Sequence, residues 1–155
     1  MKKVLSAILA FVDPNEHLVV IENETREIIC NTIERISPFM TNDFETGTDA
    51  VHAALRMDPD RIIYGEVRDG SALELCKAWN TGHSGGMTTL HCDGVDELYG
   101  RLADMVSEVS MSVPERTIRH AMQAVIHIGF KDNRRQILEI KDFTEENKKI
   151  FTEGK

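Results

Sequence analysis

Two spacings of apolar residues organise the chain. Apolar positions recur at helical spacing over 4–12, which predicts an amphipathic helix that stops before Pro14. The run at 18–21 is instead unbroken and β-branched, which is typical of a strand covered on both faces. The segment 61–68 begins with a second apolar run of this kind and ends in charged residues. A third predicted strand covers 87–91. The pattern therefore predicts a parallel sheet.

Helical patterns lie between and after these strands. Helices are expected at 46–55, 71–80, 93–109 and from 113 onward. The segment 28–39 is ambiguous, and its pattern is compatible with a short strand followed by a loop. Two strand-like runs, 125–130 and 136–143, predict a β-hairpin that extends one edge of the sheet. The fold class is thus α/β, with one domain over 1–143 and a charged tail at 144–155.

Composition narrows the range of partners. The 155 residues include 18 Lys and Arg against 26 Asp and Glu, a formal net charge of −8. This balance argues against a general binder of nucleic acids or anionic membranes, because such binding needs clustered positive charge. The three cysteines show no CxxC spacing, which favours a reducing cytoplasm over a disulfide scaffold.

The apolar stretch at 4–12 follows two lysines but does not resemble a membrane signal. A bilayer-spanning helix needs roughly 20 apolar residues, and no small-residue cleavage site follows this stretch. We expect no transmembrane segment. The predicted location is the cytoplasm, with attachment to the inner membrane only through partners.

Polar clusters follow the predicted strands. Glu22-Asn23-Glu24 is assigned to the first strand, Glu66-Val67-Arg68 to the second, and the pair His83 and His91 to the third. Because the carboxyl ends of parallel strands share one edge of a sheet, we expect these acids and imidazoles to gather in one crevice. Such a set suits a charged ligand and a hydrolytic water.

Glu66 is the strongest single candidate for a catalytic residue. A carboxylate directly after a buried strand can orient or deprotonate water, or hold Mg²⁺ through water, and Gly65 permits close backbone approach. The alternative is a structural ion pair with Arg68 or Arg61. Arg68 itself fits either a phosphate ligand or a partner of Glu66.

His83 and His91 flank Gly85-Gly86, and this arrangement favours phosphate sensing by imidazole and backbone N–H groups. A zinc site with Cys92 is the alternative, although the spacing matches no closed tetrahedral pattern. We therefore predict no resident metal site.

Three longer motifs carry a resemblance to a known family. The segment 55–68, LRMDPDRIIYGEVR, closely resembles the Walker B region of the hexameric secretion ATPases, the motors of type II and type IV secretion, type IV pili and conjugative transfer. The segment 78–91 resembles that family's histidine box, and 19–27 resembles its aspartate box. The three motifs occur in the same order as in the family, and the resemblance covers roughly residues 1–130.

The resemblance implies roles for the candidates. It implies a RecA-like P-loop NTPase core, with ATP and Mg²⁺ as ligands and a hexamer at the inner-membrane secretion machinery. Glu66 matches the catalytic glutamate that readies the attacking water, and Glu22 matches the aspartate-box glutamate near Mg²⁺. The four remaining candidates would be nucleotide-binding residues: His83, His91, Arg68 and Arg56.

The sequence departs from the family pattern in two ways. Asn23 stands where the family usually has aspartate, which removes a charge near the metal. The phosphate-binding loop GxxxxGK(S/T) is absent, and the chain begins at Met1-Lys2-Lys3, where that loop would end. The central strand leading into the loop is absent with it. Losing one preorganised donor typically costs about 2.7–4 kcal/mol of transition-state stabilisation.

Two functional hypotheses follow. In the first, the chain is the carboxy-terminal part of a secretion or conjugation ATPase and cannot hydrolyse ATP alone. In the second, it is a non-catalytic interaction module that docks on a full-length motor or its secretion complex.

Overall fold

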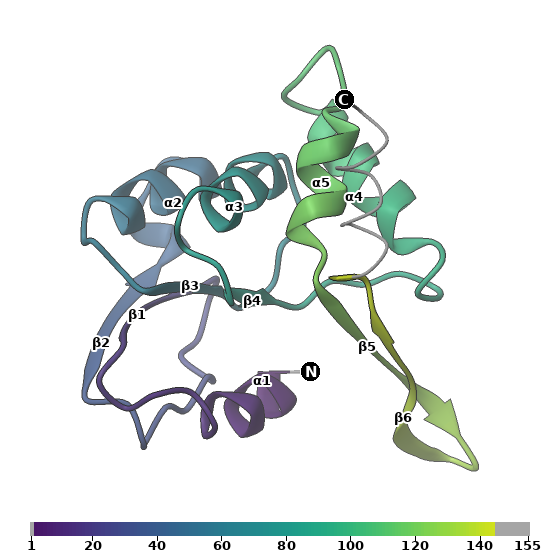
Figure 1. Ribbon diagram of the computed structural model, residues 1–155, viewed down its shortest axis with the longest axis horizontal. Helices are drawn as coiled ribbons and strands as arrows, with labels where there is room; N and C mark the ends of the chain where they lie inside the picture. Colours follow the sequence, from purple (N-terminus) through teal and green to yellow (C-terminus); the bar gives the residue numbers. More distant parts are fainter. Residues whose placement is uncertain (1, 145–155) are drawn as a thin grey trace.

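The computed structural model describes residues 2–144, and a four-stranded parallel sheet forms its centre (Figure 1). The strand order is β2-β1-β3-β4. The strands are β1 (His17–Glu22), β2 (Arg35–Met40), β3 (Arg61–Tyr64) and β4 (Met87–Thr88). The predicted α/β class with a mostly parallel sheet is confirmed.

Strand β1 lies between β2 and β3, and all six of its residues are buried. Its unbroken apolar run reflects this position, because both faces of the strand are covered. Strand β2 is the outer neighbour and resolves the ambiguous segment 28–39. It is an edge strand, the place in a sheet where a proline such as Pro38 is tolerated because one side of the strand forms no ladder.

Helices cover both faces of the sheet. They are α1 (Lys2–Leu9), α2 (Gly47–Leu55), α3 (Ser71–Asn80), α4 (Leu98–Ser107) and α5 (Glu115–Ala121), with a short 3₁₀ turn at Thr41–Asp43. Figure 1 shows α1 beneath the sheet and α2 and α3 above it. Leu18, Val20 and Ile63 pack toward α1, whereas Val19 and Ile62 belong to the larger core on the opposite face.

The carboxy-terminal hairpin consists of β5 (Ala124–Lys131) and β6 (Arg134–Asp142), paired antiparallel. Asp132 and Asn133 form its two-residue turn with φ of 51° and 58°, the left-handed conformation that tight hairpins use. The expectation that this hairpin extends the main sheet is wrong for the described residues. It forms a separate two-stranded sheet, with no ladder to β4.

The division into a domain at 1–143 and a tail at 144–155 stays a prediction, since residues after Thr144 lie outside the described part of the chain. Within residues 2–144, none of the helices has the length and apolar character needed to cross a bilayer.

Candidate active site at the carboxyl edge of the sheet

The ends of β1, β3 and β4 place several of the predicted residues together. Glu22 is the last residue of β1, and Glu66 follows β3 by two residues. The Gly65 N–H donates to the Ile21 carbonyl at 2.7 Å, which continues the β1–β3 pairing up to these two acids. The side chain of Thr89 donates to the Gly65 carbonyl at 2.7 Å, which holds the segment leading to His91 against the same edge.

Glu66 lies at the centre of an ion-pair group. Arg68 donates to both of its carboxylate oxygens, from Nε at 2.7 Å and from a terminal nitrogen at 2.8 Å. His91 Nε2 lies 3.4 Å from Glu66 Oε1. The hydrogen bonds from Arg68 are the main reason why the pKa of Glu66 lies below its ordinary value.

The structural alternative for Glu66, an ion pair with Arg68 or Arg61, is confirmed for Arg68 only. The ion pair with Arg68 exists, whereas Arg61 is engaged elsewhere, by Glu16 and by the Gly85 carbonyl. The side chain of Glu66 is 13% exposed and that of Arg68 is 63% exposed. The arginine can therefore leave the carboxylate more easily than the carboxylate can move.

Glu22 is buried and organises the loop after β1. Its Oε1 accepts hydrogen bonds from the backbone N–H groups of Glu27 at 2.9 Å and Ile28 at 3.1 Å. Lys2 Nζ lies 3.7 Å from the same oxygen. The amino end of α1 therefore brings a positive charge to the carboxyl edge of the sheet.

Lys2 is the site residue that the sequence pattern did not single out. It lies near the chain start, and no spacing or neighbouring motif distinguishes it from Lys3. Its Cε also lies 3.5 Å from where a Cβ on Gly65 would stand, so its stem runs between the two acidic strand ends.

His83 does not lie in this crevice, and the expectation that both imidazoles gather there is wrong for this residue. Its Nδ1 is 2.7 Å from the carbonyl of Pro59, just before β3 begins. His83 and His91 flank β4, and residues on either side of a strand lie at its opposite ends. The zinc alternative, which needed both imidazoles, fails for the same reason.

Arg56 also lies toward the amino edge, at the end of α2 and ahead of β3. Gly85 and Gly86 share this edge and serve packing there. A Cβ on Gly86 would lie 1.8 Å from Trp79 Nε1 and 2.6 Å from the Ile62 carbonyl, so only glycine lets the indole donate to that carbonyl. The predicted use of these glycines for phosphate sensing beside Glu66 is not compatible with this placement.

Carboxylate and amide oxygens are among the potential ligand atoms at this edge of the sheet. Within residues 2–144, no three His, Cys, Asp or Glu side chains converge to hold a metal ion. Asn23 Oδ1, next to Glu22, is buried and has no hydrogen-bond partner in the described part of the chain. An orphaned amide oxygen beside a carboxylate is a suitable acceptor for metal-bound water.

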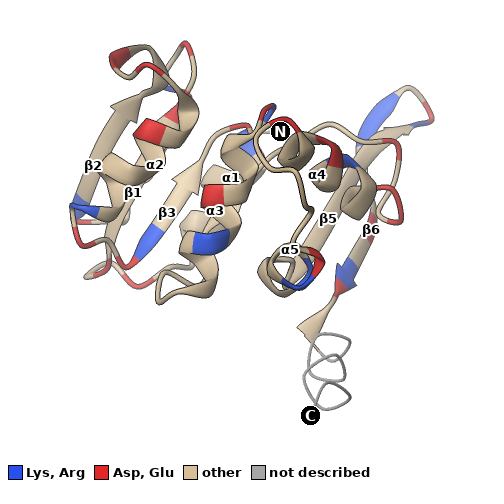
Figure 2. Cartoon of the chain, turned by 90° about the horizontal axis from the view of Figure 1, so that it is seen from above, with Lys and Arg blue, Asp and Glu red and all other residues tan. Residues whose placement is uncertain are grey.

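Charged residues are distributed over many elements. Figure 2 shows Lys and Arg on several helices and strands, interspersed with Asp and Glu. The chemistry of the carboxyl edge therefore comes from specific contacts among a few residues rather than from a field of one sign.

Comparisons with known proteins agree with one another. The profile of a family described as type II/IV secretion system protein matches residues 2–153. The conjugal transfer protein TrbB of Rhizobium radiobacter is 37% identical over 127 residues, which cover 82% of this chain and 39% of that protein. The type IV secretion system protein PtlH of Bordetella pertussis is 31% identical over 140 residues, covering 84% of this chain and 41% of PtlH.

Solved structures show the same fold. The VirB11 ATPase of the Brucella suis type IV secretion system, crystallised with sulphate, superposes with a TM-score of 0.88 at 20% identity, covering 97% of this chain and 47% of that one. The Legionella pneumophila ATPase DotB gives a TM-score of 0.69 at 27% identity, over 98% and 43%. The chain thus spans about two fifths of the length of its curated relatives.

Proposed function

The chain belongs to the type II/IV secretion system protein family, and from this premise we propose that it supplies the water-activating half of the ATP site in a conjugal-transfer or type IV secretion motor. The observation that carries the proposal is the cluster at the carboxyl edge. There Glu66 lies 3.4 Å from His91, one strand away from buried Glu22.

Glu66 is the proposed general base. It sits at the end of a buried strand, where a ligand at the sheet edge brings its attacking water within reach. A carboxylate held by two hydrogen bonds from arginine is a poor proton acceptor, so the bonds with Arg68 must open before Glu66 can act. The exposed guanidinium is then free to bind phosphate oxygens, for which its planar fork is suited.

Glu22 and Asn23 are proposed to hold water on Mg²⁺. Mg²⁺ keeps several waters when it binds with nucleotide phosphates, so an outer ring of oxygen acceptors is the contribution expected from the protein. Glu22 already has its loop bonds in place, and Lys2 keeps its charge balanced.

His91 is the proposed contact for the terminal phosphate. Its side chain is 77% exposed, next to the acid that would activate the water. We leave His83 out of this site because it lies at the other end of the sheet. A role for Arg56 at a boundary between subunits stays a prediction.

We further propose that these 155 residues do not hydrolyse ATP by themselves, because the sequence holds no GxxxxGK(S/T) loop to cradle the phosphates. Assembly into a hexamer, work at the inner-membrane secretion machinery and a cytoplasmic location belong to the same proposal. Membership of the family supports these parts of the proposal.

A chimaera tests the proposal. The matched stretch of TrbB from Rhizobium radiobacter is replaced by the corresponding residues of this chain, and Mg²⁺-dependent ATP hydrolysis is compared with that of unmodified TrbB. We expect the chimaera to hydrolyse ATP and Glu66→Gln to reduce the rate by about 10²–10⁴-fold. Glu34→Gln is the matched control, since Glu34 is exposed at the amino edge, just before β2.

The outcome also decides between the two hypotheses from the sequence. Hydrolysis that depends on Glu66 supports the motor. A folded chimaera that is inactive beside an active TrbB, while the 155-residue chain still binds intact TrbB, would instead favour the docking module.

A further inference from the structure

The segment that carries Glu66 lies beyond the end of its strand. Strand β3 ends at Tyr64, so Gly65, Glu66 and Val67 follow the last residue that pairs with β4. Gly65 and Val67 are both buried, and they flank Glu66 on either side. Buried peptide groups outside a ladder need other partners. The partners of this short segment therefore decide where the Glu66 carboxylate lies.

Thr89 supplies two of these partners, one from its side chain and one from its backbone. Its hydroxyl donates to the Gly65 carbonyl at 2.7 Å, and its own carbonyl accepts from the Val67 N–H at 3.0 Å. These belong to the two peptide groups that join Glu66 to its neighbours. One residue thus holds the backbone on both sides of the acid.

The Thr89 hydroxyl takes the place of a backbone donor. The β3–β4 register pairs Tyr64 with Thr88, so its next step would pair Gly65 with Thr89. Strand β4 ends at Thr88, and the Gly65 carbonyl accepts from a side chain at this next step. A side-chain hydrogen bond can be removed by a single substitution, which makes this link open to a direct test.

The same segment brings His91 to Glu66. Leu90 and Cys92 pack against the larger core. Thr89 and His91 alternate with them and contact the segment after β3 instead. This alternation is that of an extended chain, in which successive side chains point to opposite sides. Thr89 therefore sits between the strand ends that carry the acid and the imidazole, which lie 3.4 Å apart.

We propose that Thr89 is a positioning residue for ATP hydrolysis, whose two hydrogen bonds fix the backbone around Glu66 and so direct its carboxylate toward the attacking water. The proposal rests on the role of Glu66 as general base given above. Thr89 acts through Glu66 and is not itself a catalytic residue. Precise placement matters because a shift of about 1 Å in a reacting group can cost on the order of 10²-fold in rate.

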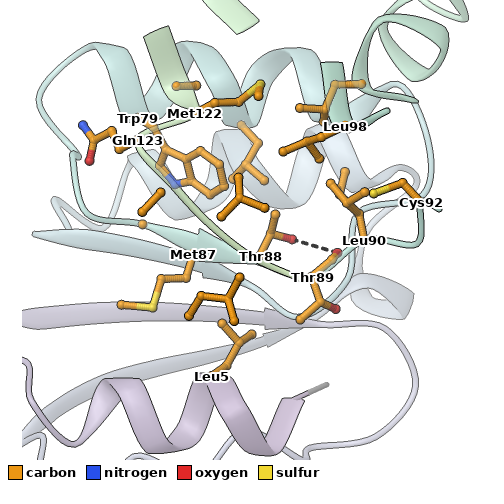
Figure 3. A pocket seen from close by; sticks show the side chains of 18 of the residues that line it. Leu5, Trp79, Met87, Thr88, Thr89, Leu90, Cys92, Leu98, Met122 and Gln123 are labelled. Atoms are coloured by element: carbon orange, nitrogen blue, oxygen red, sulfur yellow. Dashed lines mark hydrogen bonds between the residues drawn. The ribbon is translucent and has the colours of Figure 1, made fainter. Parts of the chain in front are cut away.

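Three substitutions in the TrbB chimaera test the proposal. Thr89→Val removes the hydroxyl and keeps a β-branched side chain, whereas Thr89→Ser keeps the hydroxyl. Thr88→Val is the matched control, because the Thr88 hydroxyl donates to the adjacent Thr89 carbonyl at 3.3 Å (Figure 3). The readout is the single-turnover rate constant at saturating enzyme, which does not depend on the fraction of the protein that is folded.

Thr89→Val should lower this rate constant by about 10–100-fold while the Kd for ATP changes by less than about threefold. Thr89→Ser and Thr88→Val should both stay within about threefold of the unsubstituted chimaera. An unchanged rate constant in Thr89→Val would overturn the proposal. So would an equal fall in Thr89→Ser or Thr88→Val, because the Thr89 hydroxyl would then not be the group that matters.

Amide hydrogen exchange in the full 155-residue chain gives a second readout that needs no ATP. The Val67 amide should exchange at least about tenfold faster in Thr89→Val than in Thr89→Ser, while the amides of β1 keep their rates. Equal Val67 exchange in the two variants would contradict the proposal, since the backbone around Glu66 would then be held without the hydroxyl.

Failure of the proposed function gives a different pattern. Undiminished hydrolysis in Glu66→Gln would show that Glu66 is not the base, and the positioning role of Thr89 would fall with it. Hydrolysis that is lost in Glu66→Gln and kept in Thr89→Val would refute the positioning role alone and leave Glu66 as the base.

Discussion

The two sides of strand β3 differ in how completely they are covered. On one side, β1 is buried at every position and is paired along its whole length with β2. On the other side, β4 has only two paired residues and both are half-buried. Beyond it, Phe130 and Ile140 of the hairpin are 71% and 66% exposed.

The difference in burial bears on the two halves of the candidate site. The β1–β3 side is a fully covered core, and the paired strands β1 and β3 determine the positions of Glu22 and Glu66. The β4 side carries His91 and borders a largely apolar cavity of about 470 Å³ (Figure 3). The proposed catalytic group therefore rests on the fully covered side, while the proposed phosphate contact His91 lies on the side that is only partly covered.

The largest effect should come from a cavity made on the fully covered side. Leu18 of β1 is fully buried in the core beneath the sheet, so Leu18→Ala is expected to cost roughly 2–5 kcal/mol of unfolding free energy. Ile140→Ala, on the exposed hairpin, should stay within about 0.5 kcal/mol. Urea unfolding of both variants gives the comparison, and similar losses would contradict the difference between the two sides.

Amide hydrogen exchange should show the same difference in the unmodified chain. Amides of β1 and β3 open only with much of the core, whereas an isolated two-stranded hairpin is marginal in water. We expect exchange at β5 to be at least about a hundredfold faster than at β1. Uniform protection across both sheets would show that the hairpin is already anchored.

Glu22→Ala should have a smaller effect than the cavity. The substitution leaves the backbone N–H groups of Glu27 and Ile28 without their buried acceptor, and we expect a loss of about 1–3 kcal/mol. Glu24→Ala is the matched control, as an exposed acid in the same loop. Equal stability of the two variants would mean that Glu22 does not organise this loop.

The smallest effect should be a change of titration at Glu66. Because Arg68 is the main cause of its lowered pKa, Arg68→Gln should bring the Glu66 pKa back toward 4.5. In the unmodified chain this lowered pKa stabilises the fold at pH values above 4.5, and the contribution is lost as pH falls through the folded-state value. Titration of the carboxyl carbon by NMR measures both values, and an unchanged pKa in Arg68→Gln would contradict the ion pair.

Much of the fold was readable from apolar spacing, because the strands covered on both faces have unbroken apolar runs. Strand β2 was ambiguous because an edge position lets Arg35, Ser37 and Pro38 replace that pattern. The separation of the hairpin from the sheet could not be foreseen, because strand periodicity does not specify a strand's neighbour.

The candidate site was predictable in part for a similar reason. Glu22 and Glu66 follow buried strands directly, so the parallel sheet brings them to one edge. The prediction for His83 was wrong because this residue precedes β4 and therefore lies at the amino edge of the sheet. Lys2 arrives there through the packing of α1, which leaves no mark in local sequence.

The most direct test of the proposed function separates ATP binding from ATP hydrolysis in the TrbB chimaera. Single-turnover hydrolysis and the Kd for ATP are measured with Glu66 and with Glu66→Gln. If Glu66 activates the attacking water, the hydrolysis rate falls by about 10²–10⁴-fold while the Kd changes by less than about threefold. An undiminished hydrolysis rate in Glu66→Gln, or a loss explained wholly by weaker ATP binding, would contradict the account.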